Sequence, residues 1–224
     1  YHVQDYTEAL EYLGYYLQAE PALGVADAHY YSALSYTRLS DYAKAFDHYD
    51  AAIEQAGDQE ILGDAWMAKA WAAGLSGADP SGIYYEFYLN NKGHVRASEA
   101  LWKAAEAMED AKNWSQAAEY YRLLHDKYPE DEGAGEAVFR AGLAAYVMGD
   151  PYTASTTWMA TLESVQAPAK RARLITWLGL AAKMAGQMEQ ARVHWGEAAR
   201  VAPQTYYGLR ANDLLHDSPP RLGS

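Results

Sequence analysis

A small residue stands four positions before a large one at several points in the sequence, and this spacing recurs at a regular interval. The pairs are Ala9 with Leu13, Ala45 with Tyr49, Ala117 with Tyr121, Ala154 with Trp158, and Ala191 with Trp195. Residues four apart lie on one face of a helix. The interval is 36 to 37 residues, with two periods from Ala45 to Ala117 and a degenerate repeat around Gly82 to Phe87. The pattern predicts a helical repeat protein.

A second helix in each repeat is indicated by another small residue, twelve positions before the alanine. These residues are Ala33, Ala105, Gly142 and Gly179. We expect two helices to cross closely at the small residues, and the large residues to fill the neighbouring groove.

The ends of the helices are also marked, by proline, glycine and capping residues in the sequence. Pro21, Pro129 and Pro203 each follow a repeat alanine by twelve residues, Gly149-Asp150-Pro151 predicts a helix end followed by a capped helix start, and Asn113 with Gln116 resembles a capping box.

The pattern predicts about twelve helices and no strand. Their ranges are 6–19, 26–39, 41–55, 62–75, 81–91, 96–111, 114–127, 134–148, 151–163, 169–185, 188–200 and 204–215. The unit from Ile175 to Pro203 fits the tetratricopeptide pattern, except that Ala182 stands where an aromatic residue is expected. The expected fold is all-α, a right-handed tetratricopeptide-like solenoid of antiparallel helices over 1–216, with a Pro/Gly-containing tail or linker at 217–224.

Charge and composition narrow the range of partners. The chain has 18 Lys and Arg against 30 Asp and Glu, a formal net charge of -12. Phosphate backbones and anionic membrane surfaces would repel so acidic a chain, so nucleic acid is not an expected partner. No segment reaches the roughly 20 apolar residues that a membrane-spanning helix needs, so no membrane insertion is expected. The absence of cysteine excludes disulfides and thiol nucleophiles.

Motifs for catalysis or cofactor binding are lacking. The seven histidines, at 2, 29, 48, 94, 125, 194 and 216, show no metal-site spacing. No nucleophile elbow, Walker loop or dinucleotide glycine pattern occurs, and Glu130-Asp131-Glu132 is interpreted as a solvated loop. We therefore predict no catalytic residue, no metal and no cofactor in this chain.

A concave groove is predicted on the first helix of each repeat pair. Its candidate lining residues are Tyr30, Trp71, Trp102, Phe139, Tyr146, Arg173 and Lys183. The alternative is that the aromatic residues are packing between repeats. Some peptide-binding relatives carry a basic residue that clamps a terminal carboxylate. The corresponding positions here are mostly acidic, which disfavours a carboxylate clamp: Asp27, Asp64, Glu99, Glu136 and, as the basic exception, Arg173.

The segment from Ala202 to Leu215 contains Pro203 and the run Tyr206-Tyr207-Gly208-Leu209, and it resembles the segment that closes the helical superhelix of soluble lytic murein transglycosylases. This resemblance implies a periplasmic or cell-envelope protein that cleaves peptidoglycan glycan strands with one glutamate. That glutamate lies in a Glu-Ser motif followed by a run ending in Gly-Leu-Met-Gln. Glu163-Ser164 lacks the run and is interpreted as coincidence, so the catalytic domain would follow Ser224.

Two functions therefore remain open. In the first, the chain is the non-catalytic scaffold of a lytic transglycosylase and threads glycan strands toward a downstream catalytic domain. In the second, it is a tetratricopeptide module that binds a peptide or assembles a protein complex. A third hypothesis, that the chain is itself an enzyme, has little support because no acid, base and nucleophile converge at readable spacing.

Overall fold

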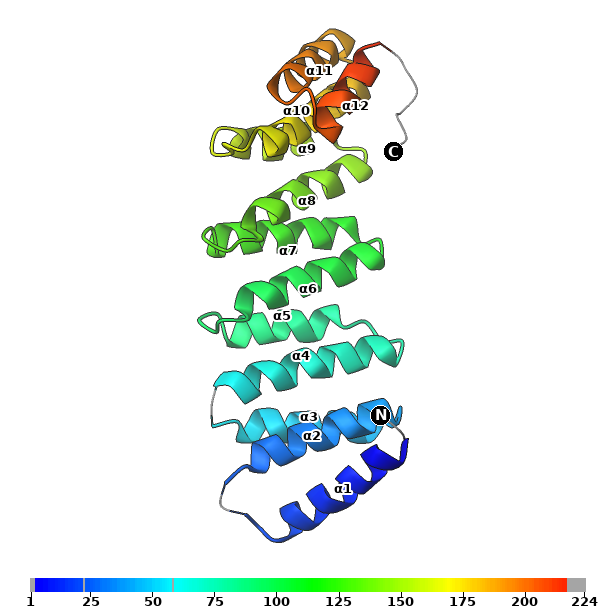
Figure 1. Ribbon diagram of the computed structural model, residues 1–224, viewed down its shortest axis with the longest axis vertical. Helices are drawn as coiled ribbons and strands as arrows, with labels where there is room; N and C mark the ends of the chain where they lie inside the picture. The colour runs from blue at the N-terminus through cyan, green and yellow to red at the C-terminus, as the bar shows by residue number, and fades with distance from the viewer. Residues whose placement is uncertain (1–2, 22, 58, 217–224) are drawn as a thin grey trace. The chain divides into compact units, whose positions relative to one another are not determined.

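The computed structural model describes residues 3–21, 23–57 and 59–216, and this part of the chain forms twelve α-helices and no strand (Figure 1). The helices are α1 Val3–Gln18, α2 Val25–Arg38, α3 Tyr42–Gln55, α4 Gln59–Leu75, α5 Ser81–Asn90, α6 Ala97–Asp110, α7 Trp114–Lys127, α8 Ala134–Val147, α9 Pro151–Leu162, α10 Pro168–Met184, α11 Met188–Val201 and α12 Tyr206–Leu215. The predicted all-α fold is confirmed. The predicted tail at 217–224 lies outside the described residues.

The helix ends follow the local chemistry of the sequence. Every predicted helix is present, with ends displaced by at most three residues. The Asp150 side chain accepts a hydrogen bond from the Thr153 amide at 3.0 Å, which caps α9 as predicted. The capping box at α7 is only half formed. Asn113 accepts from the Gln116 amide, but the Gln116 side chain donates to Glu119 instead of returning to the cap.

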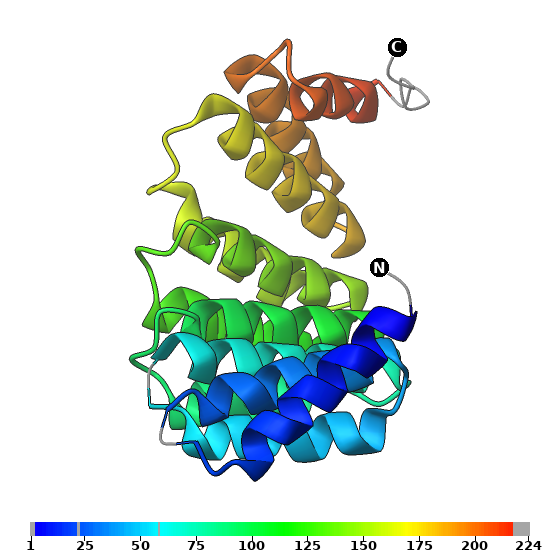
Figure 2. The ribbon, with the colours of Figure 1, turned by 60° about the horizontal axis from the view of Figure 1, so that its bottom comes forward.

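The chain divides into two compact units within α6, between Ala107 and Met108. In the N-terminal unit, α2 packs against α3, α3 against α4, and α1 against α2. Figure 2 shows α1 crossing α2 obliquely at the end of this unit. In the C-terminal unit, α7 packs against α8, α8 against α9, and α10 against α9, α11 and α12. Within each unit, most of these contacts thus join helices that are neighbours in the sequence.

In the N-terminal unit, the contact between a small residue and a large one joins an alanine of α2 to a tyrosine of α3. Ala33 of α2 packs in one cluster with Ala45 and Tyr49 of α3, and all three are fully buried. The Thr37 hydroxyl donates to the Ala33 carbonyl at 2.8 Å. Its oxygen therefore accepts from the Tyr49 hydroxyl at 3.2 Å, which satisfies the buried polar end of the tyrosine.

In the C-terminal unit the same contact uses glycine and tryptophan. A Cβ on Gly142 would overlap the indole of Trp158, and a Cβ on Gly179 would overlap the indole of Trp195. The larger indole therefore requires glycine, whereas Ala33 stands opposite the smaller ring of Tyr49. Each indole N–H donates to the carbonyl three residues before its glycine: Trp158 to Phe139 at 3.0 Å and Trp195 to Thr176 at 3.3 Å. The repeat register predicted from the small residues is confirmed.

The closing helix α12 also depends on a glycine. A Cβ on Gly208 would overlap the backbone carbonyl of Ala202, so only glycine allows this close approach. Thr205 caps the helix through the Gly208 amide, and the Thr176 hydroxyl lies 3.3 Å from the Tyr207 carbonyl. These contacts explain in physical terms why a threonine precedes the Tyr-Tyr-Gly-Leu run and why its third residue is glycine.

We predict opposite effects for two glycine-to-alanine substitutions in helices. Gly142→Ala should destabilise the protein by about 1 to 3 kcal/mol, because the added Cβ would overlap the fully buried indole of Trp158 and force it to shift. Gly196→Ala should stabilise it by about 0.5 to 1 kcal/mol, because no atom lies near its Cβ position and glycine disfavours a helix. Denaturant unfolding measures both, and a shift of the same sign in the two variants would contradict the register.

Candidate functional site

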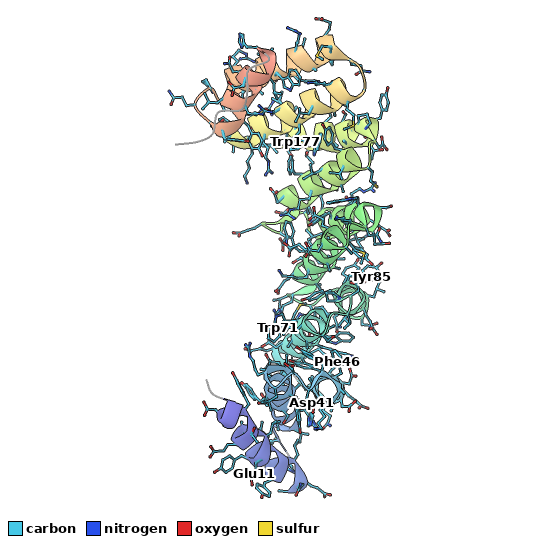
Figure 3. The ribbon with its side chains drawn as sticks, turned by 90° about the vertical axis from the view of Figure 1, so that its right-hand side faces the viewer. Glu11, Asp41, Phe46, Trp71, Tyr85 and Trp177 are labelled. Atoms are coloured by element: carbon cyan, nitrogen blue, oxygen red, sulfur yellow. The ribbon has the colours of Figure 1, made fainter. Side chains whose placement is uncertain are left out.

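In the N-terminal unit, α2, α4 and α6 are the first helices of the repeat pairs, and the surface that they form is called the first-helix face. This face carries an exposed tryptophan. Trp71 of α4 is 37% exposed, and the Arg38 guanidinium of α2 lies over its ring, 4.9 Å from the centroid. In Figure 3 Trp71 lies on the left-hand side of this unit, and Tyr85 of α5 lies on its right-hand side. The cation–π contact fixes the indole while one part of it stays open to solvent.

An ion-pair network lies on the same first-helix face. The Arg96 guanidinium, just before α6, pairs with Asp64 of α4 and, at 2.8 Å, with Glu99 of α6. Burial, followed by the negative charge of Asp64, raises the pKa of the Tyr30 hydroxyl to about 12. Tyr30 is half-buried and packs on the α2–α3 core. A crevice of about 290 Å³ is lined by Glu60, Asp64, His94 and Arg96, among others.

The predicted lining residues of the C-terminal unit form an aromatic cluster. Phe139 of α8 is only 6% exposed and stacks on Trp158 with 5.9 Å between the ring centroids. Tyr146 meets Trp177 edge to face at 5.4 Å, and Phe139 meets Trp177 in the same way at 6.1 Å. Trp177 is labelled in Figure 3. Phe139 therefore belongs to a buried cluster of this unit, together with Trp158 and Leu178.

The two charged candidate residues of the C-terminal unit, Arg173 and Lys183, have different surroundings. Arg173 of α10 donates to Glu136 at 2.6 Å, and its guanidinium lies 3.9 Å from the Phe139 ring centroid. Lys183 is exposed near the end of α10. A cavity of about 340 Å³ beside Arg173 is also lined by Glu132, Glu136 and Lys170, among others. The structure does not test whether any candidate residue binds a ligand, and the groove remains a prediction.

The remaining candidate, Trp102 of α6, is half-buried. Glu163, of the lone Glu-Ser pair, is exposed and follows α9 directly, while the Ser164 hydroxyl donates to the Thr161 carbonyl at 2.8 Å.

Two polar clusters between helices were not predicted from the sequence. Glu109 accepts from the Tyr121 hydroxyl at 2.6 Å and from Arg140 at 2.5 Å, and burial together with Glu109 raises the pKa of Tyr121. His29 and His48 face each other with their Nδ1 atoms 2.9 Å apart, and burial lowers the pKa of both rings. The signal was present in the sequence: His29 with His48 and Tyr121 with Arg140 are each 19 residues apart, about half a repeat.

Residues 3–21, 23–57 and 59–216 contain neither a membrane-spanning helix nor a metal site of three or more ligands. None of the helices there is long and apolar enough to cross a membrane. The same residues contain no group of three or more His, Cys, Asp or Glu side chains arranged to hold a metal ion.

Truncation to alanine should separate the buried from the exposed aromatic residues. Phe139→Ala should lower the free energy of unfolding by about 3 to 5 kcal/mol, because it leaves a cavity among buried rings. Trp71→Ala should lower it by about 1 kcal/mol or less, because the indole is partly solvated in the folded state. Urea unfolding of the two variants provides the comparison. Equal losses would show that Trp71 is a core residue and would remove it from the candidate surface.

Comparison of the sequence with known protein families identifies the helical repeat in two segments of the chain. The Tetratricopeptide repeat family matches residues 27–58, which span α2 and α3, and residues 99–131, which span α6 and α7. Both matches begin in a first helix and continue through its second helix, in agreement with the register described above. A search of curated proteins gave no significant match.

Solved structures with similar folds extend the likeness over most of the chain. BtubC from P. vanneervenii is 16% identical with a TM-score of 0.52, over 99% of this chain and 95% of that one. YrrB, a TPR protein with an unusual peptide-binding site, is 17% identical with a TM-score of 0.51, over 95% and 100%. The C-terminal part of a TPR repeat-containing protein from Cytophaga hutchinsonii is 13% identical with a TM-score of 0.59, over 94% and 81%. The chain is therefore a tetratricopeptide-like helical repeat domain.

Proposed function

We propose that the chain is a protein-interaction scaffold that binds an extended peptide segment of a partner on the first-helix face of its N-terminal unit. The observation that carries this proposal is the partly exposed Trp71 indole under the Arg38 guanidinium. Tryptophan and arginine dominate binding energy at protein interfaces, because they combine a large contact area with directional polar contacts.

The surroundings of Trp71 favour binding without large rearrangement. Arg38 fixes the indole, and the ion pairs of Arg96 with Asp64 and Glu99 hold three further side chains of this face in place. Side chains that are already ordered lose less conformational entropy when a partner binds. Trp71 would accept an apolar side chain of the peptide, and the crevice beside Asp64 would accept a neighbouring side chain.

The charges of this face disfavour recognition of a terminal carboxylate. Arg96, the basic residue at the crevice, is already paired with two carboxylates. A third carboxylate from a ligand would have to displace one of them. We therefore propose that the partner contributes an internal segment with an apolar anchor rather than a free C-terminus.

The scaffold of a lytic transglycosylase remains the second candidate. It is supported by the likeness of the Ala202 to Leu215 segment to the segment that closes the helical superhelix of that family. The comparisons with known proteins give no support to a peptidoglycan ligand, and the peptide-binding function fits them better. A periplasmic or envelope location would follow only from this second candidate.

Binding should depend on Trp71. Peptides selected from a random 12-residue phage library on the full chain would be synthesised, labelled and titrated by fluorescence anisotropy. Trp71→Ala should weaken their binding at least tenfold, in line with the loss of a central tryptophan. Tyr152→Ala is the matched control, because Tyr152 is 66% exposed on the second helix α9 and should change the affinity less than twofold.

Two outcomes would count against the peptide proposal. One is selected peptides whose affinity is unchanged by Trp71→Ala, which would place binding elsewhere. The other is a failure to select any peptide, combined with saturable binding of soluble glycan fragments by tryptophan fluorescence. The second outcome would favour the lytic transglycosylase scaffold, provided that the titration reaches millimolar ligand, where the binding free energy is only about -4 kcal/mol.

A further inference from the structure

The contact between α2 and α3 contains a pair of histidines in an unusual arrangement. The Nδ1 atoms of His29 and His48 are 2.9 Å apart, with 5.1 Å between the ring centroids. The Tyr36 ring stacks on His48 at 5.3 Å and limits rotation of that imidazole. Both histidines are half-buried, so the pair lies at the edge of the core and keeps contact with solvent.

The repeat itself shows that packing does not require a histidine here. His29 stands four residues before the small residue Ala33. The equivalent positions before Ala105, Gly142 and Gly179 hold Leu101, Val138 and Ile175, all of them buried apolar side chains. His29 therefore replaces an aliphatic core residue and places a polar ring opposite a second imidazole. A change of this kind lowers apolar burial and calls for a chemical explanation.

We infer that His29 and His48 form a two-histidine site for a divalent transition-metal ion, with Cu²⁺ or Ni²⁺ as the preferred metal. Metal–imidazole bonds are about 2.0 to 2.1 Å long. Two such bonds at a right angle place the nitrogens about 2.9 Å apart, whereas a tetrahedral angle places them about 3.3 Å apart. The observed 2.9 Å matches the right angle of tetragonal Cu²⁺ and Ni²⁺ complexes.

Binding requires only a local change of protonation and ring orientation. Without metal, one Nδ1–H donates to the Nδ1 lone pair of the other ring. A bound ion needs lone pairs on both Nδ1 atoms, so the donating ring must carry its proton on Nε2 instead. Both rings stay neutral, which is the form that ligates metals. A small rotation must then direct the two lone pairs toward one point, and water fills the remaining coordination positions. The site would join α2 to α3 and is independent of the Trp71 surface.

Copper binding to the full chain tests the inference. Isothermal titration with Cu²⁺ should show a site of micromolar or tighter affinity, and electron paramagnetic resonance should show coupling to two imidazole nitrogens. His29→Leu should weaken this site at least tenfold and remove the two-imidazole signal. Leucine is the appropriate substitute because Leu101 occupies the equivalent position in another repeat, so the variant is expected to fold.

Two further variants make the result decisive. His48→Ala removes the other ligand and should cause the same loss. His194→Ala is the matched control, because His194 occupies the position of His48 in the last repeat, and the residue 19 positions before it is Ile175 in place of a histidine. It should leave the two-imidazole signal unchanged. Equal copper affinity and an equal spectrum in wild type, His29→Leu and His48→Ala would overturn the inference and leave the pair as a hydrogen bond only. Circular dichroism confirms that each variant is folded.

Discussion

The contact between a small residue of one helix and an aromatic residue of the next, seen between α2 and α3, α8 and α9, and α10 and α11, determines much of this structure. In the C-terminal unit the indoles of Trp158 and Trp195 occupy the space that a Cβ would take at Gly142 and Gly179. In the N-terminal unit, alanine suffices opposite the smaller ring of Tyr49. The size of the aromatic residue and the size of its partner thus vary together, as close packing of a protein interior requires.

These contacts also satisfy the polar ends of the buried rings. The tryptophan N–H groups donate to backbone carbonyls of the preceding first helix. The Tyr49 hydroxyl is hydrogen-bonded to the Thr37 hydroxyl, and the Tyr121 hydroxyl donates to Glu109. Because these rings pack between the two helices of a repeat, other positions of the first helices remain available for binding a partner. Trp71 lies at such a position, where it is partly exposed and held by Arg38.

The sequence predicted the helices well because each prediction depended on local chemistry. The repeat spacing located the buried residues, and Asp150 with Pro151 located the start of α9. The candidate site was harder, because residues at equivalent repeat positions have different surroundings. Phe139 is buried under Arg173, whereas Tyr30 in the corresponding position is half-buried near Asp64. Which ring stays open depends on neighbours from other helices, and a repeat pattern alone does not specify them.

Contacts between helices could have been predicted in part. Residues about half a repeat apart meet repeatedly: His29 with His48, Phe139 with Trp158, and Thr176 with Trp195 are each 19 residues apart. Applied to the sequence, this offset would have paired the two histidines. It would not have given the 2.9 Å separation of their Nδ1 atoms, which depends on side-chain rotation and on the stacking of Tyr36.

A double-mutant cycle on Gly179 and Trp195 tests most directly whether the paired sizes of these residues hold the repeats together. The cycle compares the unfolding free energies of wild type, Gly179→Ala, Trp195→Tyr and the double variant, which reproduces the alanine and tyrosine of the N-terminal unit. The account predicts that the double variant is at least about 1 kcal/mol more stable than the sum of the single effects implies. Additivity within about 0.5 kcal/mol would contradict it, because the two residues would then act independently.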